Sequence, residues 1–260
     1  MKKKDQIILS VIVILFILFG FLAYTATTNN RVKPIQDTYR FAAINFHNTT
    51  FDVVKIEPKN LDLLNFYYKD KNNQKFGTIA ALSKWLETQG KRLIFATNGG
   101  IFSKNYTPMG LYIENGKKIS DLNTNNGEGN FYLKPNGVFL VKQGKAEIVE
   151  TSKYQDSSDI SFAIQSGPML VSNRVVNPLF EENSQSIYIR SGVGITPVGN
   201  TVFAISNEPV TLYEFASFFK ENLGCNNALY LDGAISEMYV TKFRENTKEE
   251  FSVIIGVMGK

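Results

Sequence analysis

Four segments of the sequence place polar side chains beside glycine at the end of an apolar, strand-like run. They are Thr97-Asn98-Gly99-Gly100, Gln165-Ser166-Gly167-Pro168, Arg190-Ser191-Gly192 and Leu231-Asp232-Gly233. Glycine lets backbone N–H groups come close to a ligand, and side chains at strand ends are held rigidly yet remain accessible. A carboxylate, a guanidinium and amides placed together in this way can bind a polar, anionic ligand. Each turn alone is better explained by local hydrogen bonding of Asn or Asp, so the prediction requires that the four turns converge.

The composition excludes several common kinds of catalytic site. The chain has 260 residues, 43% of them hydrophobic, with one cysteine and one histidine, which indicates a globular protein. Cys225 has no partner for an internal disulfide, and a Cys/His zinc site is excluded. We expect Cys225 to be a small buried residue and His47 to be an ordinary sheet residue. Without the three lysines at positions 2–4 and Asp5, the chain has 25 basic and 23 acidic residues, and this net charge of +2 without a basic run argues against a nucleic-acid partner.

Other polar residues favour structural explanations. Ser236 lacks the Gly-x-Ser-x-Gly context of an activated serine, so we expect it to form a hydrogen bond. Glu237 is either a second carboxylate of the site or an exposed loop charge. The acidic and amide residues between 121 and 129 do not have the spacing of an EF-hand loop, and a mobile polar lid is expected there instead. No metal site and no cofactor are predicted.

The elements that position these turns are mostly strands. Periodicity predicts strands at 39–47, 50–57, 61–68 and 92–96, and helices at 78–89 and 211–223. Asn115-Gly116 and Asn136-Gly137 are typical of hairpin turns. Strand and helix do not alternate regularly, which favours an α+β fold with a mixed, largely antiparallel sheet and two main helices.

The N-terminus predicts a membrane segment ahead of this domain. Three lysines at positions 2–4 precede an apolar run from Ile7 to Ala23, and the positive-inside rule places the N-terminus in the cytoplasm. We expect residues 1–26 to be a transmembrane signal anchor, 27–37 a linker, and 38–260 a domain outside the cytoplasm. The alternative is a cleaved signal peptide and a secreted protein, although the apolar core is longer than is usual for one.

Taken together, the motifs resemble the phosphodiester glycosidase family. The resemblance covers about residues 40–258 and rests on segments that also include Pro108-Met109-Gly110-Leu111, Gly129-Asn130-Phe131, Asn136-Gly137-Val138-Phe139 and Gln165-Ser166-Gly167-Pro168-Met169-Leu170. The family includes a lysosomal enzyme that removes N-acetylglucosamine from a phosphodiester on mannose. Its glycosidase branch usually reads Leu-Asp-Gly-Gly before the serine. This chain has Ala234 and Ile235 there, which resembles a bacterial branch.

The resemblance implies a hydrolase that cleaves a sugar–phosphate bond, with a cell-envelope glycan as the expected partner. Asp232 is the expected carboxylate at the anomeric carbon and Arg190 the expected phosphate partner, unless the two form a structural ion pair. Further substrate-binding residues are expected in the glycine turns and beside them: Asn98, Gly99, Gly100, Asn130, Gln165, Ser166, Gly167, Gly233 and Ser236. A non-catalytic glycan-binding or envelope-assembly module with the same fold is the alternative.

Overall fold

The computed structural model describes residues 33–35, 39–245 and 249–259, the first three by their backbone alone. The predicted anchor and most of the predicted linker lie outside these residues. Within the described ranges, none of the helices combines the length and the hydropathy that a membrane crossing requires.

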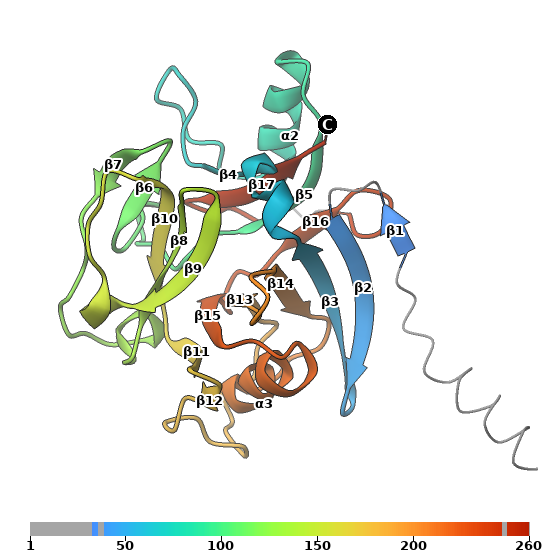
Figure 1. Ribbon diagram of the computed structural model, residues 1–260, viewed down its shortest axis with the longest axis vertical. Coiled ribbons are helices and arrows are strands. Elements are labelled where there is room, and N and C mark those ends of the chain that lie inside the picture. The colour runs from blue at the N-terminus through green and yellow to red at the C-terminus, as the bar shows by residue number, and fades with distance from the viewer. Residues whose placement is uncertain (1–32, 36–38, 246–248, 260) are drawn as a thin grey trace, which may run out of the picture. The chain divides into compact units, whose positions relative to one another are not determined.

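The largest sheet has eight strands in the order β1-β2-β3-β14-β13-β15-β11-β12, and every neighbouring pair is antiparallel (Figure 1). Its strands are β1 (Lys33–Ile35), β2 (Tyr39–Phe46), β3 (Thr49–Ile56), β11 (Met169–Ser172), β12 (Val175–Val176), β13 (Ser191–Ile195), β14 (Thr201–Ser206) and β15 (Asn227–Asp232). Strand β1 pairs with β2, so part of the predicted linker joins the sheet.

Two smaller antiparallel sheets complete the domain. The five-stranded sheet has the order β7-β6-β10-β8-β9, and the four-stranded sheet β16-β5-β17-β4. The first contains β6 (Tyr112–Glu114), β7 (Lys117–Ser120), β8 (Gly137–Lys142), β9 (Lys145–Glu150) and β10 (Ile160–Ser166). The second contains β4 (Leu64–Tyr67), β5 (Leu93–Asn98), β16 (Met238–Val240) and β17 (Ile254–Met258).

Few helices accompany the sheets. Helix α2 (Ile79–Thr88) packs its buried face, including Leu82 and Leu86, on β5 and β17. Helix α3 (Leu212–Ser217) continues into the π-helical turn η4 (Phe218–Asn222) and packs on the eight-stranded sheet. Short 3-10 turns occupy η1 (Pro58–Leu63), η2 (Asn130–Tyr132) and η3 (Thr151–Lys153). The prediction of an α+β fold with a largely antiparallel sheet is confirmed.

The main core lies where the three sheets meet. Phe203 of the eight-stranded sheet has its ring centroid 5.2 Å from that of Phe95 in β5 and 5.9 Å from that of Phe139 in β8. All three rings are fully buried, as expected for aromatic side chains that link packed layers. The ends of β5, β10 and β15 are therefore held in fixed positions relative to one another.

Two local predictions are wrong for identifiable reasons. The expected strand at 61–68 is reduced to β4, because Pro58 starts the 3-10 turn η1 instead. Asn136-Gly137 is not a hairpin turn: Gly137 begins β8, where a larger side chain would run into Met169 and the Val149 carbonyl. The turn between β8 and β9 is made by Gln143 and Gly144, both with positive φ, whereas the predicted turn at Asn115-Gly116 is confirmed.

Candidate functional site

Three of the four glycine turns meet in one buried cluster of polar groups. Asn98, at the end of β5, donates from Nδ2 to Ser191 Oγ at 2.9 Å. Ser191 Oγ lies 3.3 Å from the carbonyl oxygen of Asp232, to which β13 is paired at this point. Ser236 Oγ lies 2.8 Å from the same carbonyl oxygen and 3.2 Å from Ser191 Oγ. Asn98, Asp232 and Ser236 are predicted site residues, and they converge although Asn98 and Asp232 end strands of two different sheets and Ser236 lies in the loop after β15.

The Asp232 side chain is the carboxylate of this cluster and is 9% exposed. Its Oδ1 accepts hydrogen bonds from the backbone N–H groups of Gly233 at 2.6 Å and Ala234 at 3.1 Å. Burial raises the pKa of Asp232 above its usual value, and backbone N–H groups of Gly233, Ala234 and Ile235 limit that rise. A carboxylate in this state takes up a proton more readily than an exposed aspartate does.

The turn that supplies Ser191 also brings Arg190 to this region, but in a buried position. Its guanidinium is fully buried and donates to the Val210 carbonyl at 2.8 Å, the Ser186 carbonyl at 2.6 Å and the Tyr230 hydroxyl at 2.9 Å. Among the ion pairs between described residues, none joins Arg190 to Asp232 or to another acid. The proposed structural ion pair is therefore not formed, and Arg190 acts on its surroundings through carbonyl groups and a phenol.

Tyr230 links Arg190 to the Asp232 turn and was not predicted from the sequence. Besides Arg190, the Asn130 side chain hydrogen-bonds the Tyr230 hydroxyl. Burial is the main cause that raises the pKa of Tyr230 well above its usual value, although the Arg190 charge opposes the rise. A side chain on Gly233 would overlap this hydroxyl, so glycine is required there by space. Tyr230 lies two residues before Asp232 in β15, but the pairing with β13 shifts its register between these two residues, so regular strand alternation does not predict where the Tyr230 side chain lies.

Gln165 and Ser166 connect the end of β10 to neighbouring segments. Ser166 Oγ donates to the Leu231 carbonyl at 3.1 Å and accepts from Ile101 N at 3.2 Å. Gln165 Oε1 accepts from the N–H groups of Leu111 at 3.1 Å and Asn123 at 2.8 Å, and its Nε2 donates to the Asn123 carbonyl at 2.7 Å. The Gln165 amide thus holds the segment that was expected to be a mobile lid.

The three glycines predicted to donate backbone N–H groups to a phosphate, Gly99, Gly100 and Gly167, differ in their contacts. Gly99 N donates to the Val253 carbonyl at 2.7 Å, so this N–H is occupied within the four-stranded sheet region. Gly100 and Gly167 pack closely, against Ser166 and Asn136 respectively, at distances that leave no room for a side chain. The assignment of Gly100 and Gly167 to phosphate binding stays a prediction.

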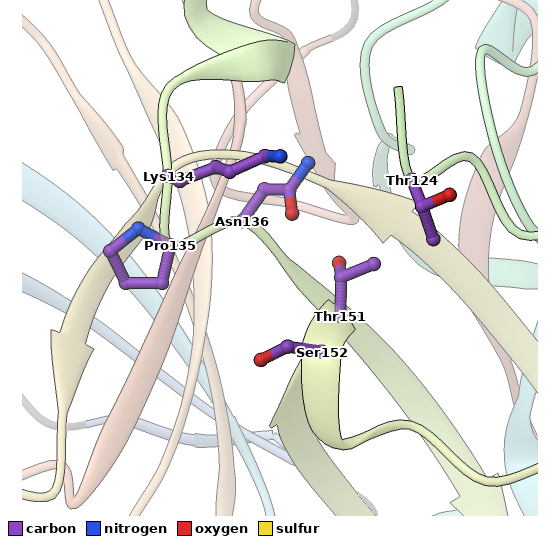
Figure 2. Close-up of a pocket in the computed structure, with 6 residues that line it drawn as sticks. All are labelled: Thr124, Lys134, Pro135, Asn136, Thr151 and Ser152. Atoms are coloured by element: carbon purple, nitrogen blue, oxygen red, sulfur yellow. The ribbon is translucent and has the colours of Figure 1, made fainter. Parts of the chain in front are cut away.

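A cavity of about 440 Å³ lies beside the Gln165 region. Figure 2 shows the side chains that line it, which come from three separate segments: Thr124, Lys134, Pro135, Asn136, Thr151 and Ser152. The hydroxyl of Thr151 is also 3.3 Å from Gln165 Nε2, so this cavity and the Gln165 contacts share a wall. The segment that contains Lys134 also supplies Asn130 to Tyr230.

The remaining candidates are placed as follows. Glu237 is 2% exposed, so the expectation of an exposed loop charge is wrong. His47 lies in the turn between β2 and β3 with φ of 50°, not within a strand, and lines a separate cavity of about 300 Å³. Cys225 is buried as predicted, and burial raises its pKa to about 12. Within the described ranges, no three His, Cys, Asp or Glu side chains are grouped to hold a metal ion.

Two solved structures have a similar fold. The fold is similar to that of a hypothetical protein from Synechocystis, with a TM-score of 0.53 and 14% identity over 85% of this chain. This chain covers 62% of that protein, less than two thirds of its length. It is also similar to a putative exported protein from Burkholderia pseudomallei, with a TM-score of 0.55 and 10% identity over 80% of this chain and 74% of the other. At these identities the likeness concerns the fold alone.

The sequence comparisons are closer. The chain is 42% identical to the uncharacterized protein YigE of Escherichia coli over 191 residues, 74% of each chain, which is consistent with a bacterial-type branch. The family described as phosphodiester glycosidase matches residues 91–257, a range that contains all four glycine turns and Asn130. The chain therefore belongs to the phosphodiester glycosidase family.

Proposed function

We propose that this protein hydrolyses the bond between a sugar and a phosphodiester, with Asp232 as the carboxylate that acts at the anomeric carbon. The observation that carries the proposal is the buried Asp232 carboxylate at the end of β15, which accepts from Gly233 N and Ala234 N while the Asp232 backbone carbonyl joins the cluster of Asn98, Ser191 and Ser236. These residues come from the range that matches the family. Membership in the family supports a glycan phosphodiester as the substrate class.

The chemistry follows from the leaving group. A water molecule attacks the anomeric carbon, the bond from this carbon to the phosphate oxygen breaks, and the phosphate leaves as an anion with the bonding electron pair. Such a leaving group needs little help from a general acid, unlike the alkoxide of an ordinary glycoside. Asp232 accepts the proton of the attacking water and stabilises positive charge on the sugar. Its raised pKa makes the Asp232 carboxylate a stronger base than an ordinary aspartate.

Arg190 supplies the positive charge of the proposed site through its contact with the Tyr230 hydroxyl. The guanidinium fixes the Tyr230 hydroxyl at 2.9 Å, and no acid among the described residues pairs with it. In a site of low dielectric constant, a buried unpaired cation attracts an anion more strongly than it would in water. We therefore propose that the positive charge of Arg190 favours phosphate binding beside Tyr230, and that the Asn130 amide is available to sugar hydroxyls. The Asn98 amide instead positions the cluster, because its Nδ2 donates to the Gly99 carbonyl and Ser191 Oγ and its Oδ1 accepts from Glu237 N.

The cellular setting is part of the proposal. If residues 1–26 anchor the chain with the domain outside the cytoplasm, a cell-envelope glycan is the accessible substrate. Binding of such a glycan without turnover is the second candidate. Two features favour this second candidate. The Gln165 amide is occupied by the backbone N–H groups of Leu111 and Asn123, and Ala234 and Ile235 follow Asp232-Gly233 where the glycosidase branch usually has a second glycine before the serine.

Sugar release from defined substrates tests the proposal. The full-length protein is incubated with a panel of methyl sugar-1-phosphodiesters, and the free sugar is measured. We expect Asp232→Asn to lower kcat/KM by about 100-fold or more, as for loss of a positioned base. The matched control is Asp159→Asn, which changes an exposed carboxylate and should leave the rate unchanged. Full activity of Asp232→Asn contradicts the proposal, and binding without turnover by the wild type across the panel supports the second candidate.

A further inference from the structure

The cavity beside Gln165 is lined by side chains that the proposed reaction does not use. Its volume of about 440 Å³ lies within the range of small-molecule sites in proteins. Its walls are joined to one another by hydrogen bonds: Thr151 N donates to the Asn136 carbonyl at 2.9 Å, and Lys134 Nζ donates to Asn126 Oδ1 at 2.6 Å. A cavity whose walls are fixed in this way is preformed, as most ligand sites are.

One acceptor of the lining has no partner in the protein. Asn136 is 5% exposed, and its Nδ2 donates to the Phe131 carbonyl at 2.9 Å. No hydrogen bond between described residues uses Asn136 Oδ1, and this oxygen is not among the fully buried atoms that lack a partner. It is therefore accessible from the cavity, and Figure 2 shows it turned toward Thr151. A nearly buried carbonyl oxygen of this kind favours a ligand that brings a donor.

Hydroxyl groups supply donors in the same cavity. Thr151 is 7% exposed, and its Oγ1 accepts from Gln165 Nε2 at 3.3 Å, which leaves the hydroxyl proton available to a ligand. The neighbouring Ser152 hydroxyl forms no hydrogen bond with another described residue. A lining that offers both an open acceptor and open donors matches the hydroxyls of a sugar or polyol, because each hydroxyl both donates and accepts. The Pro135 ring adds apolar surface for the C–H groups of such a ligand.

The charge of the lining indicates what else the ligand carries. Of the six lining residues, Lys134 alone is charged. None of the ion pairs between described residues involves Lys134, whereas the nearby Lys153 is paired with Glu150 at 3.0 Å. One ammonium matches one negative charge. A phosphodiester carries one, whereas a phosphate monoester carries about 1.5 to 2 at pH 7.

We propose that this cavity binds a sugar or polyol unit that carries a phosphodiester, with its hydroxyls at Asn136 and Thr151 and its phosphate at Lys134. Such a unit is what a glycan chain linked by phosphodiesters repeats, so the cavity is a second place on the protein that binds the chain. The inference rests on the proposed function for the class of glycan, but not for hydrolysis, because none of the lining residues takes part in the reaction.

Calorimetric titration of the full-length protein with a defined probe tests the inference. The probe is the methyl diester of glucose 6-phosphate, whose phosphate is not on the anomeric carbon, so the proposed reaction does not consume it. Glucose and dimethyl phosphate represent its two halves. We expect the wild type to bind the probe at least about tenfold more tightly than either half, because both sets of contacts are then made at once.

Three variants locate the binding. Lys134→Gln should weaken binding of the probe by about tenfold, as for loss of a charge-assisted hydrogen bond, and Thr151→Val by about threefold. Lys134 is exposed, so its substitution is compatible with folding. The matched control Lys145→Gln removes an exposed lysine at the start of β9, outside the lining, and should bind the probe as the wild type does.

Several results would overturn the inference. They are no binding of the probe at millimolar concentration, equal affinity for the probe and dimethyl phosphate, and unchanged affinity in Lys134→Gln. Tighter binding of glucose 6-phosphate than of its methyl diester would also overturn it, in favour of a free sugar phosphate as the ligand.

Failure of the proposed function gives a different pattern. If the probe binds in a manner that depends on Lys134 but no sugar-1-phosphodiester is hydrolysed, the proposed function fails and the inference stands. If sugar is released but the probe does not bind, the inference fails and the proposed function stands.

Discussion

Substitution of Gly233 by alanine places a methyl group where the structure has a hydroxyl. The added carbon would overlap the Tyr230 hydroxyl oxygen, and it would lie 3.0 Å from Tyr230 Cζ and 3.2 Å from Arg190 Nη1. The φ of Gly233 is not among the positive values, so the expected effect is steric. To restore ordinary contact the hydroxyl has to retreat by about 1 Å or more. That movement breaks the 2.9 Å hydrogen bond with Arg190.

The magnitude follows from two costs. Forcing a methyl group into a packed site costs about 1–3 kcal/mol, and leaving the buried Arg190 donor without its partner costs about 1–3 kcal/mol more. We therefore expect Gly233→Ala to lower the free energy of unfolding by about 2–6 kcal/mol. Tyr230→Phe alone should cost about 1–3 kcal/mol, because it also leaves the Arg190 donor unpaired.

A double-mutant cycle in urea unfolding of the full-length protein isolates the contact. Removing the hydroxyl makes room for the methyl group, so the two substitutions together should cost at least about 1 kcal/mol less than the sum of the single costs. The control pairs Gly233→Ala with Tyr239→Phe, which removes a hydroxyl bound to Thr241 instead. That control pair should be additive. Additive costs for Gly233→Ala and Tyr230→Phe would refute the reasoning.

Three further predictions concern other residues of the site region. Burial raises the pKa of Asp232, so the stability of the wild type falls as the pH rises from the pKa of an ordinary aspartate through the raised pKa of the folded protein. Asp232→Asn should therefore have a higher melting temperature than the wild type at pH 7, and the difference should close near pH 3. A lower melting temperature of the variant at pH 7 would contradict this cause. Gln165→Leu removes the acceptor of Asn123 N and should lower the free energy of unfolding by about 1–3 kcal/mol, with faster amide hydrogen exchange at Asn123. The control Gln143→Leu loses one exposed hydrogen bond and should change the stability little. The Cys225 thiol, with its pKa raised to about 12, should resist iodoacetamide at pH 8 in the folded protein and react in urea, and rapid reaction of the folded protein would show that it is accessible.

The sequence predicts the turns of the site better than the contacts between them. Asn98 and Asp232 lie at strand ends next to glycine, and such turns can be predicted because their conformation depends mainly on the residues within the turn. Tyr230 was missed because it sits inside an apolar strand, where a tyrosine is ordinarily a core residue. Its role depends on Arg190 and Asn130, which lie 40 and 100 positions earlier in the chain, so no local pattern reveals it.

Other differences also arise from long-range packing. Gln165 was predicted to bind sugar hydroxyls, but its amide satisfies backbone groups more than 40 residues away along the chain. The Asn136-Gly137 pair has the composition of a hairpin turn, yet the space beside Met169 and Val149 requires glycine at that point within β8. The largely antiparallel architecture was predictable because alternation and the lack of regular strand–helix order are properties of the whole chain.

The most direct test of the central claim is the position of the bond that is broken. Hydrolysis of a sugar-1-phosphodiester by the full-length protein is carried out in water enriched in oxygen-18, and the masses of the two products are measured by mass spectrometry. Attack at the anomeric carbon, assisted by Asp232, places the heavy oxygen in the released sugar. Heavy oxygen in the phosphate product instead would mean attack at phosphorus, which would contradict the assignment of Asp232 to the sugar.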